Sequence, residues 1–238
     1  MKKVFLLSVI VLTTLLGSVS LSSCGDDNGD DVETSDFGFS KSSYTALAGS
    51  VGQLDVKGNP TSWSSSDDFI ASVSNDGTIS ANHVGKCEIT MYEGLRSARC
   101  TFEVMPVYST YTDPYIKWGA KKDAVKAYEK RNLLKEESKA LYYEEKGSVR
   151  GLVYVFNDYG RLAGVMVLVE HRFNTDIARE LAEFLKERYR VISISTTESY
   201  FADGSNKENS KTLITVDLNP KDYPGYLMVY YTPYPKSE

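Results

Sequence analysis

The chain has 238 residues, a length that is enough for two modest folded domains. Its 32 acidic residues outnumber its 27 lysines and arginines, and no stripe of basic residues is present, so the composition argues against nucleic-acid binding. Only two histidines occur, which disfavours a zinc centre and histidine-based catalysis.

The N-terminus has the pattern of an export signal. Lys2 and Lys3 precede an apolar run at residues 4–16, and small residues then lead to Cys24. The run is shorter than the ~20 residues that span a bilayer, so we expect residues 1–23 to be a cleaved signal peptide. The segment Leu21-Ser22-Ser23-Cys24 resembles a lipobox, and this resemblance implies lipidation of Cys24. An ordinary secretory signal followed by a chance cysteine is the alternative.

Residues 24–36 are predicted to form an acidic tether without lysine or arginine. Its acidic residues are Asp26, Asp27, Asp30, Asp31, Glu33 and Asp36. A segment of like charge stays solvated and extended. It resembles the acidic signal that directs some lipoproteins to the outer face of the outer membrane, and a flexible spacer is a compatible interpretation. We therefore expect a protein held to the outer membrane by lipid and exposed at the cell surface.

Residues 37–105 are predicted to form an all-β sandwich, because short strands alternate with turn signals. One of these is a tight turn at Asn75-Asp76-Gly77, where glycine supplies a positive φ. Four blocks follow in order: Trp63-Ser64-Ser65-Ser66, Ile70-Ala71-Ser72-Val73-Ser74, Asp76-Gly77-Thr78-Ile79 and Gly85-Lys86-Cys87-Glu88-Ile89-Thr90. These blocks resemble the bacterial immunoglobulin-like group 2 family of intimin- and invasin-type surface proteins. The resemblance implies a domain for display, spacing or adhesion, and it brings no catalytic residues.

A disulfide between Cys87 and Cys100 is expected from the pairing of the two strands that hold them. If Glu93 and Gly94 form a two-residue hairpin loop, Cys87 lies opposite Cys100. Opposed residues have Cα atoms ~4.5–5.5 Å apart, which is within disulfide range. Export to an oxidising compartment favours the bond. Two buried free thiols are the alternative.

Residues 106–114 contain two prolines and are predicted to be a linker, and residues 115–238 are predicted to form an α+β domain. Helices are expected near residues 118–128, with Ala124, Val125 and Tyr128 on one face, and after residue 174, with Asn174 or Thr175 as the cap. The second helix has apolar residues at helical spacing: Ile177, Leu181, Phe184 and Leu185. Each helix is followed by three strand candidates. This order suggests a duplicated unit of one helix and three antiparallel strands. The arrangement is weakly similar to that of β-lactamase-inhibitory-protein-type envelope and inhibitor proteins.

No catalytic constellation is recognised, so we expect no enzyme activity, no cofactor and no metal site. His83 and His171 lie in different domains and are interpreted as a structural residue and a turn residue. A carboxylate pair for polysaccharide cleavage would require acids such as Glu144, Glu145 and Asp158 to meet in space.

Tyrosine is the unusual feature of the second domain. In Tyr142-Tyr143 and Tyr230-Tyr231 the partners point to opposite faces of a strand, so one of each pair is expected at the surface. With Tyr226 they form a possible binding surface for a glycan or another protein, because tyrosine offers an apolar face and a hydroxyl. Tyrosines that merely favour half-buried strands are the alternative.

The sequence thus favours a non-enzymatic cell-surface lipoprotein in which an immunoglobulin-like spacer presents a glycan-binding or protein-binding domain. An envelope assembly or inhibitor protein that acts in the periplasm is a second hypothesis. A polysaccharide hydrolase is a third.

Overall fold

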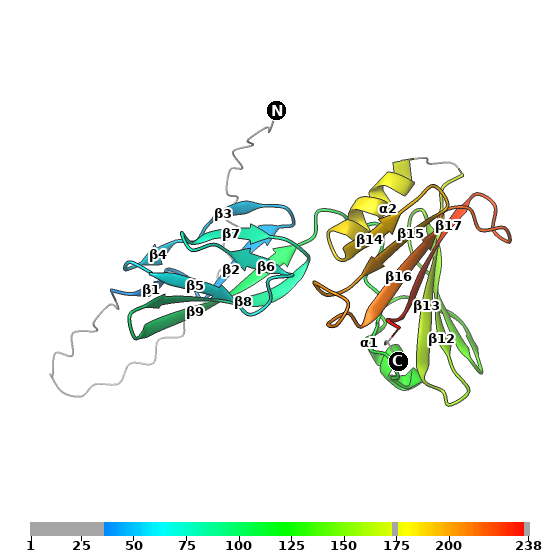
Figure 1. The fold of residues 1–238 in the computed structure, drawn as a ribbon. Helices are drawn as coiled ribbons and strands as arrows, with labels where there is room; N and C mark the ends of the chain where they lie inside the picture. Colours follow the sequence, from blue (N-terminus) through cyan, green and yellow to red (C-terminus); the bar gives the residue numbers. More distant parts are fainter. Residues whose placement is uncertain (1–35, 173–175, 236–238) are drawn as a thin grey trace, which may run out of the picture. The chain divides into compact units, whose positions relative to one another are not determined.

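The computed structural model describes residues 36–172 and 176–235, which form two β-rich domains (Figure 1). Each domain has its own hydrophobic core. No helix within these two ranges is long and apolar enough to cross a membrane. The predicted signal peptide, Cys24 and the tether up to residue 35 lie outside the described residues.

The first domain consists of strands in three sheets, with orders β2-β9-β8-β5, β3-β7-β6 and β1-β4. The strands are β1 (Gly38–Phe39), β2 (Ser43–Leu47), β3 (Val51–Gln53), β4 (Val56–Lys57), β5 (Ser62–Ser65), β6 (Ala71–Val73), β7 (Thr78–Ala81), β8 (Gly85–Glu93) and β9 (Arg96–Met105). The predicted turn at Asp76-Gly77 is confirmed. Gly77 has a φ of +80°, and a Cβ atom there would lie 2.8 Å from the Trp63 ring, so the position requires glycine.

The predicted pairing of Cys87 with Cys100 is wrong, because the β8–β9 turn lies one residue later than expected. Glu93 pairs with Arg96, so Gly94 and Leu95 form the loop, and Gly94 adopts the positive φ of +59° that such a turn needs. Cys87 therefore faces Phe102, and Cys100 faces Ile89. Both cysteines are buried free thiols.

Free thiols at these positions predict a specific alkylation result. Burial raises the pKa of both thiols, that of Cys100 to about 12, so little thiolate forms near neutral pH. At pH 8 without reductant, we expect iodoacetamide to modify neither residue in the folded chain and both in 8 M urea, as counted by mass spectrometry. A chain that reacts in urea only after a reductant is added would contradict the free thiols.

The second domain is built on one eight-stranded antiparallel sheet with the order β10-β11-β12-β13-β17-β16-β15-β14 (Figure 1). Its helices are α1 (Lys122–Tyr128) and α2 (Asp176–Lys186). Its strands are β10 (Leu133–Glu137), β11 (Ala140–Tyr143), β12 (Val149–Phe156), β13 (Leu162–Glu170), β14 (Arg190–Ile194), β15 (Glu198–Ala202), β16 (Thr212–Asp217) and β17 (Tyr226–Pro233). Each helix is thus followed by four strands that pair in sequence order, and β13 and β17 join the two groups.

The hydrophobic core of this domain lies on one face of the sheet. Helix α2 contributes four buried apolar residues at helical spacing, as predicted: Ile177, Leu181, Phe184 and Leu185. The expected cap of this helix at Asn174 or Thr175 lies outside the described residues. Helix α1 contributes only Val125, whereas Tyr128, which was expected on the same buried face, is 46% exposed.

The expected unit of one helix and three strands is wrong by one strand in each half. Strands β10 and β15 were not predicted. All five residues of β10 are exposed at the edge of the sheet, so no alternation of buried and exposed residues marks it in the sequence.

Candidate functional site

The predicted tyrosine surface divides between the two faces of the eight-stranded sheet. Tyr143 and Tyr231 are 3% and 0% exposed and belong to the core. Tyr142, Tyr226 and Tyr230 are half-buried and lie on the opposite face. The alternation predicted within each Tyr-Tyr pair is therefore what the structure has, and only three of the five tyrosines reach the surface.

A row of side chains crosses six neighbouring strands on this opposite face, and we call it the open face. Strand pairing places its members directly side by side in the order Tyr142, Val153, Met166, Tyr230, Thr215 and Tyr200. All six are half-buried, and both described helices pack on the other face. Tyr200 was missed in the sequence because its strand, β15, was not recognised.

Contacts between β10 and β11 and within β15 hold two tyrosines of the open face. The Tyr142 hydroxyl donates to Glu137 Oε2 at 3.2 Å, and Lys135 Nζ lies 5.7 Å from the centre of the Tyr142 ring. The Tyr200 hydroxyl donates to Glu198 at 2.5 Å. The hydrogen bonds to Glu137 and Glu198 raise the pKa of these two phenols, since a carboxylate stabilises the protonated hydroxyl.

Acidic residues lie beside one end of the open face. Burial raises the pKa of Tyr230, and the nearby carboxylates of Asp217 and Asp222 raise it further. Asp217 accepts the backbone N–H of Asn219 at 2.9 Å. Among the described residues, no lysine or arginine forms an ion pair with Glu198, Asp217 or Asp222. This end of the open face would therefore attract a cationic group of a ligand.

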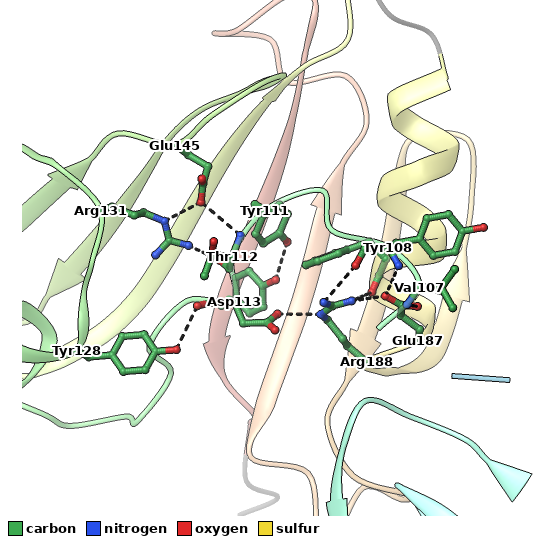
Figure 2. A network of polar contacts seen from close by, with 12 residues as sticks. Val107, Tyr108, Tyr111, Thr112, Asp113, Tyr128, Arg131, Glu145, Glu187 and Arg188 are labelled. Atoms are coloured by element: carbon green, nitrogen blue, oxygen red, sulfur yellow. Dashed lines mark hydrogen bonds and ion pairs between the residues drawn. The ribbon is translucent and has the colours of Figure 1, made fainter. Parts of the chain in front are cut away.

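A second candidate region is the polar network that holds residues 107–113 against the sheet and α2 (Figure 2). The Glu187 carboxylate accepts the backbone N–H groups of Val107 and Tyr108 at 2.9 and 3.0 Å. Arg188 donates to Asp113 Oδ1 at 2.9 Å and to Glu187 Oε1 at 2.5 Å. The predicted linker is thus tied to the second domain along most of its length.

The buried hydroxyls of this network extend into the core. The hydroxyls of Tyr111 and Tyr231 lie 2.6 Å apart, and both rings are buried. Burial is the largest cause that raises the pKa of Tyr111, Tyr189 and Tyr231 far above the usual value, so these phenols stay protonated in the folded domain.

Arg131 forms the other half of the network, where it contacts Glu145 and Thr112 (Figure 2). It donates to Glu129 at 2.5 and 2.7 Å, to Glu145 Oε2 at 2.7 Å, and to the backbone oxygen of Thr112. The hydroxyl of Tyr154 also donates to Glu129. The side chains of Arg131 and Glu129 are 8% and 1% exposed, so this is a buried and fully paired ion cluster.

The residues considered for catalysis do not form one site. Glu145 is bound to Arg131, and Glu144 accepts the Asn132 side chain at 3.3 Å. Asp158 pairs with Lys139 beyond the opposite end of β12. His83 stacks on Phe69 at 3.8 Å, and its Nδ1 lies 2.7 Å from the Phe69 backbone oxygen. Within residues 36–172 and 176–235, no group of three or more His, Cys, Asp or Glu residues could hold a metal ion.

Comparison with known families identifies the first domain. Residues 38–102 match the bacterial Ig-like domain (group 2) family, and a domain of this kind indicates a bacterial surface or adhesion-type role. No curated protein matches the chain.

Proposed function

We propose, from the bacterial Ig-like domain at residues 38–102, that the protein is a non-enzymatic, lipid-anchored protein of the bacterial cell surface. The Ig-like domain acts as a spacer, and the second domain binds a partner protein through the open face. The lipobox-like segment before Cys24 and the acidic residues up to Asp36 support anchoring and surface exposure.

The observation that carries this proposal is the row of tyrosines on the open face. Strands lie ~4.8 Å apart, so Tyr142 and Tyr230 are separated by about 14 Å, and Tyr200 lies about 10 Å further along the row. Met166 and Val153 fill the space between the first two. Tyrosine and methionine are enriched at the centres of protein interfaces, where rigid rings lose little entropy on binding.

The charges beside the row indicate what the partner presents. Glu198, Asp217 and Asp222 form no ion pairs within the described residues, and cations are attracted both to carboxylates and to tyrosine rings. We therefore propose a partner protein that inserts lysine or arginine among apolar residues. A glycan, the other ligand class that exposed tyrosines suit, becomes an alternative outcome of the test.

The second domain is also proposed to descend from a duplicated unit of one helix and four strands, related in architecture to inhibitory envelope proteins. Tyr142 in β11 and Tyr200 in β15 occupy equivalent strands of the two halves, and both edge strands contain an irregularity in their pairing. In related sequences, we expect the two halves to align with Tyr142 against Tyr200. Halves that align in another register would contradict a duplication.

Binding through the open face is tested by photo-crosslinking on intact cells, with a photoreactive residue at position 166. We expect one protein to be captured, and its purified form to bind the Tyr230→Ala variant at least tenfold more weakly than the unchanged chain. Tyr159→Ala is the matched control, because Tyr159 is 87% exposed and lies in the β12–β13 turn. Equal affinity of the Tyr230→Ala variant, or ligands that are only glycans, would contradict the proposal.

Anchoring and surface exposure are tested separately from binding. Labelled palmitate is expected to enter the unchanged chain and not the Cys24→Ser variant. Protease added to intact cells is expected to degrade the protein. Resistance of the anchored protein to that protease would support the periplasmic alternative instead.

A further inference from the structure

A cleft of about 920 Å³ opens beside Arg131, and none of its lining residues belongs to the row of side chains on the open face. It is lined by three segments: residue 112, residues 127–132 at the end of α1, and residues 144–146 between β11 and β12. The volume falls in the range of small-molecule sites, which is about 300–1,000 Å³.

The floor of this cleft is rigid. Arg131 bonds to all three lining segments through Glu129, Glu145 and the backbone oxygen of Thr112. Both carboxylates belong to side chains that are no more than 11% exposed. A site whose walls are joined by one buried guanidinium is preorganised, so a ligand would lose little affinity to reordering of the walls.

The charges of the lining cancel. Lys130, Arg131 and Lys146 balance Glu129, Glu144 and Glu145, and the Arg131 guanidinium already donates to Glu129, Glu145 and the Thr112 backbone oxygen. A strongly anionic or cationic ligand would meet like charges as well as opposite ones. The lining instead offers hydrogen-bond donors and acceptors side by side, in the Asn132 amide and the Glu144 carboxylate.

One aromatic ring borders the cleft. Tyr128 is 46% exposed, its ring packs against Tyr115 at 5.1 Å between centres, and its hydroxyl donates to the Asp113 backbone oxygen at 3.4 Å. The ring is therefore held at both ends and keeps an accessible apolar surface. An apolar ring surface beside paired donors and acceptors is complementary to a sugar ring, which combines an apolar C–H face with hydroxyls that both donate and accept.

We propose that this cleft, with Tyr128 as the stacking platform and Asn132 and Glu144 as hydroxyl partners, binds one unit of a neutral saccharide. The residues of this site are not those of the row on the open face, so the proposal stands independently of the protein partner proposed above.

The test is a titration of the soluble chain with neutral hexose and N-acetylhexosamine oligosaccharides, followed by calorimetry and by NMR saturation transfer. We expect at least one neutral oligosaccharide to bind with a Kd below 1 mM. The Tyr128→Ala and Asn132→Ala variants are expected to weaken binding at least tenfold, while Tyr159→Ala leaves it unchanged. Fluorescence of Trp118 and circular dichroism establish that each variant is folded.

Tyr128→Leu provides a second variant if Tyr128→Ala does not fold, because leucine retains packing against Tyr115 and lacks an aromatic face. Three results would overturn the proposal: no neutral oligosaccharide that binds at millimolar concentration, unchanged affinity in a folded Tyr128 variant, or tighter binding of sulfated or cationic oligosaccharides than of neutral ones. Capture of the open-face partner is expected to be normal in all of these variants, so the two proposals fail separately.

Discussion

Replacing Arg131 by methionine is expected to destabilise the second domain by about 3–5 kcal/mol, because the change removes one partner of a buried ion cluster. Glu129, whose side chain is 1% exposed, would keep only the hydroxyl of Tyr154, and Glu145 would lose its charged partner. Methionine fills part of the space without charge, so the loss reports the stranded carboxylates more than a cavity.

The two tryptophans allow this loss to be assigned to one domain. Trp63 packs in the core of the first domain, and Trp118 packs in the second, where its Nε1 donates to Thr212 at 3.1 Å. In a Trp63→Phe background, tryptophan fluorescence comes from Trp118 and reports the unfolding of the second domain alone. The urea midpoint is expected to fall by roughly 2 M, given slopes of about 1–3 kcal/mol per M.

Arg179→Met is the matched control for this prediction. Arg179 also pairs with a carboxylate, that of Asp176, but the two side chains are 77% and 80% exposed. Its loss is expected to change stability by no more than ~0.5 kcal/mol. Adding Glu129→Gln to Arg131→Met should restore part of the stability, because the second change removes the stranded charge. An Arg131→Met midpoint equal to that of Arg179→Met would contradict the buried-cluster account.

Elements with a periodic pattern of burial could be predicted from the sequence, and elements held only by pairing could not. Helix α2 buries Ile177, Leu181 and Phe184 on one side, so its period is visible in the sequence. Strand β10 buries none of its residues and is defined by its backbone hydrogen bonds to β11. Such hydrogen bonds require no alternation of apolar and polar residues, so the sequence does not show them. The short helix α1 buries Val125 alone, too little to indicate which way Tyr128 points.

The β8–β9 hairpin shows how far alternation constrains strand register. Cys87, Ile89, Cys100 and Phe102 all lie on the buried face of the two strands. A slip that keeps every side chain on its face is invisible to a pattern of period two, so alternation alone could not separate the predicted register from the observed one. The position of the turn at Gly94 and Leu95 decided it.

The polar networks could not be predicted, because their partners are distant in the sequence. Arg188 and Asp113 are 75 positions apart, and Arg131 and Thr112 are 19 apart. Charged residues in a single sequence are expected at the solvated surface, and only the fold shows that the charged residues of these networks are buried. The tyrosine surface was predicted in part, since alternation gave the two faces and left open which of them the helices cover.

Replacing Arg188 by methionine is expected to cost about 3–5 kcal/mol and also to release residues 107–113 from α2. Arg188 is 8% exposed, and its guanidinium lies 3.7 Å from the centre of the Phe184 ring. Methionine retains contact with that ring but leaves the Glu187 carboxylate, 7% exposed, without its cation. The loss of stability is measured as the urea midpoint of the second domain, followed by Trp118 fluorescence. The release of residues 107–113 is measured as cleavage by chymotrypsin after Tyr108.

The exposure of the two acidic partners determines which of them matters. Asp113 is 47% exposed, so Asp113→Asn should cost less than ~1 kcal/mol, as surface ion pairs do. Glu187 is buried and accepts the backbone N–H groups of Val107 and Tyr108 as well as a hydrogen bond from Arg188. The Glu187→Leu change should therefore cost nearly as much stability as Arg188→Met. Because a buried pair is poorly screened by salt, 1 M NaCl should leave the difference between Arg188→Met and the unchanged chain nearly the same. A loss that disappears in high salt, or equal losses for Asp113→Asn and Glu187→Leu, would show that the residues 107–113 are held by surface electrostatics and not by the buried pair.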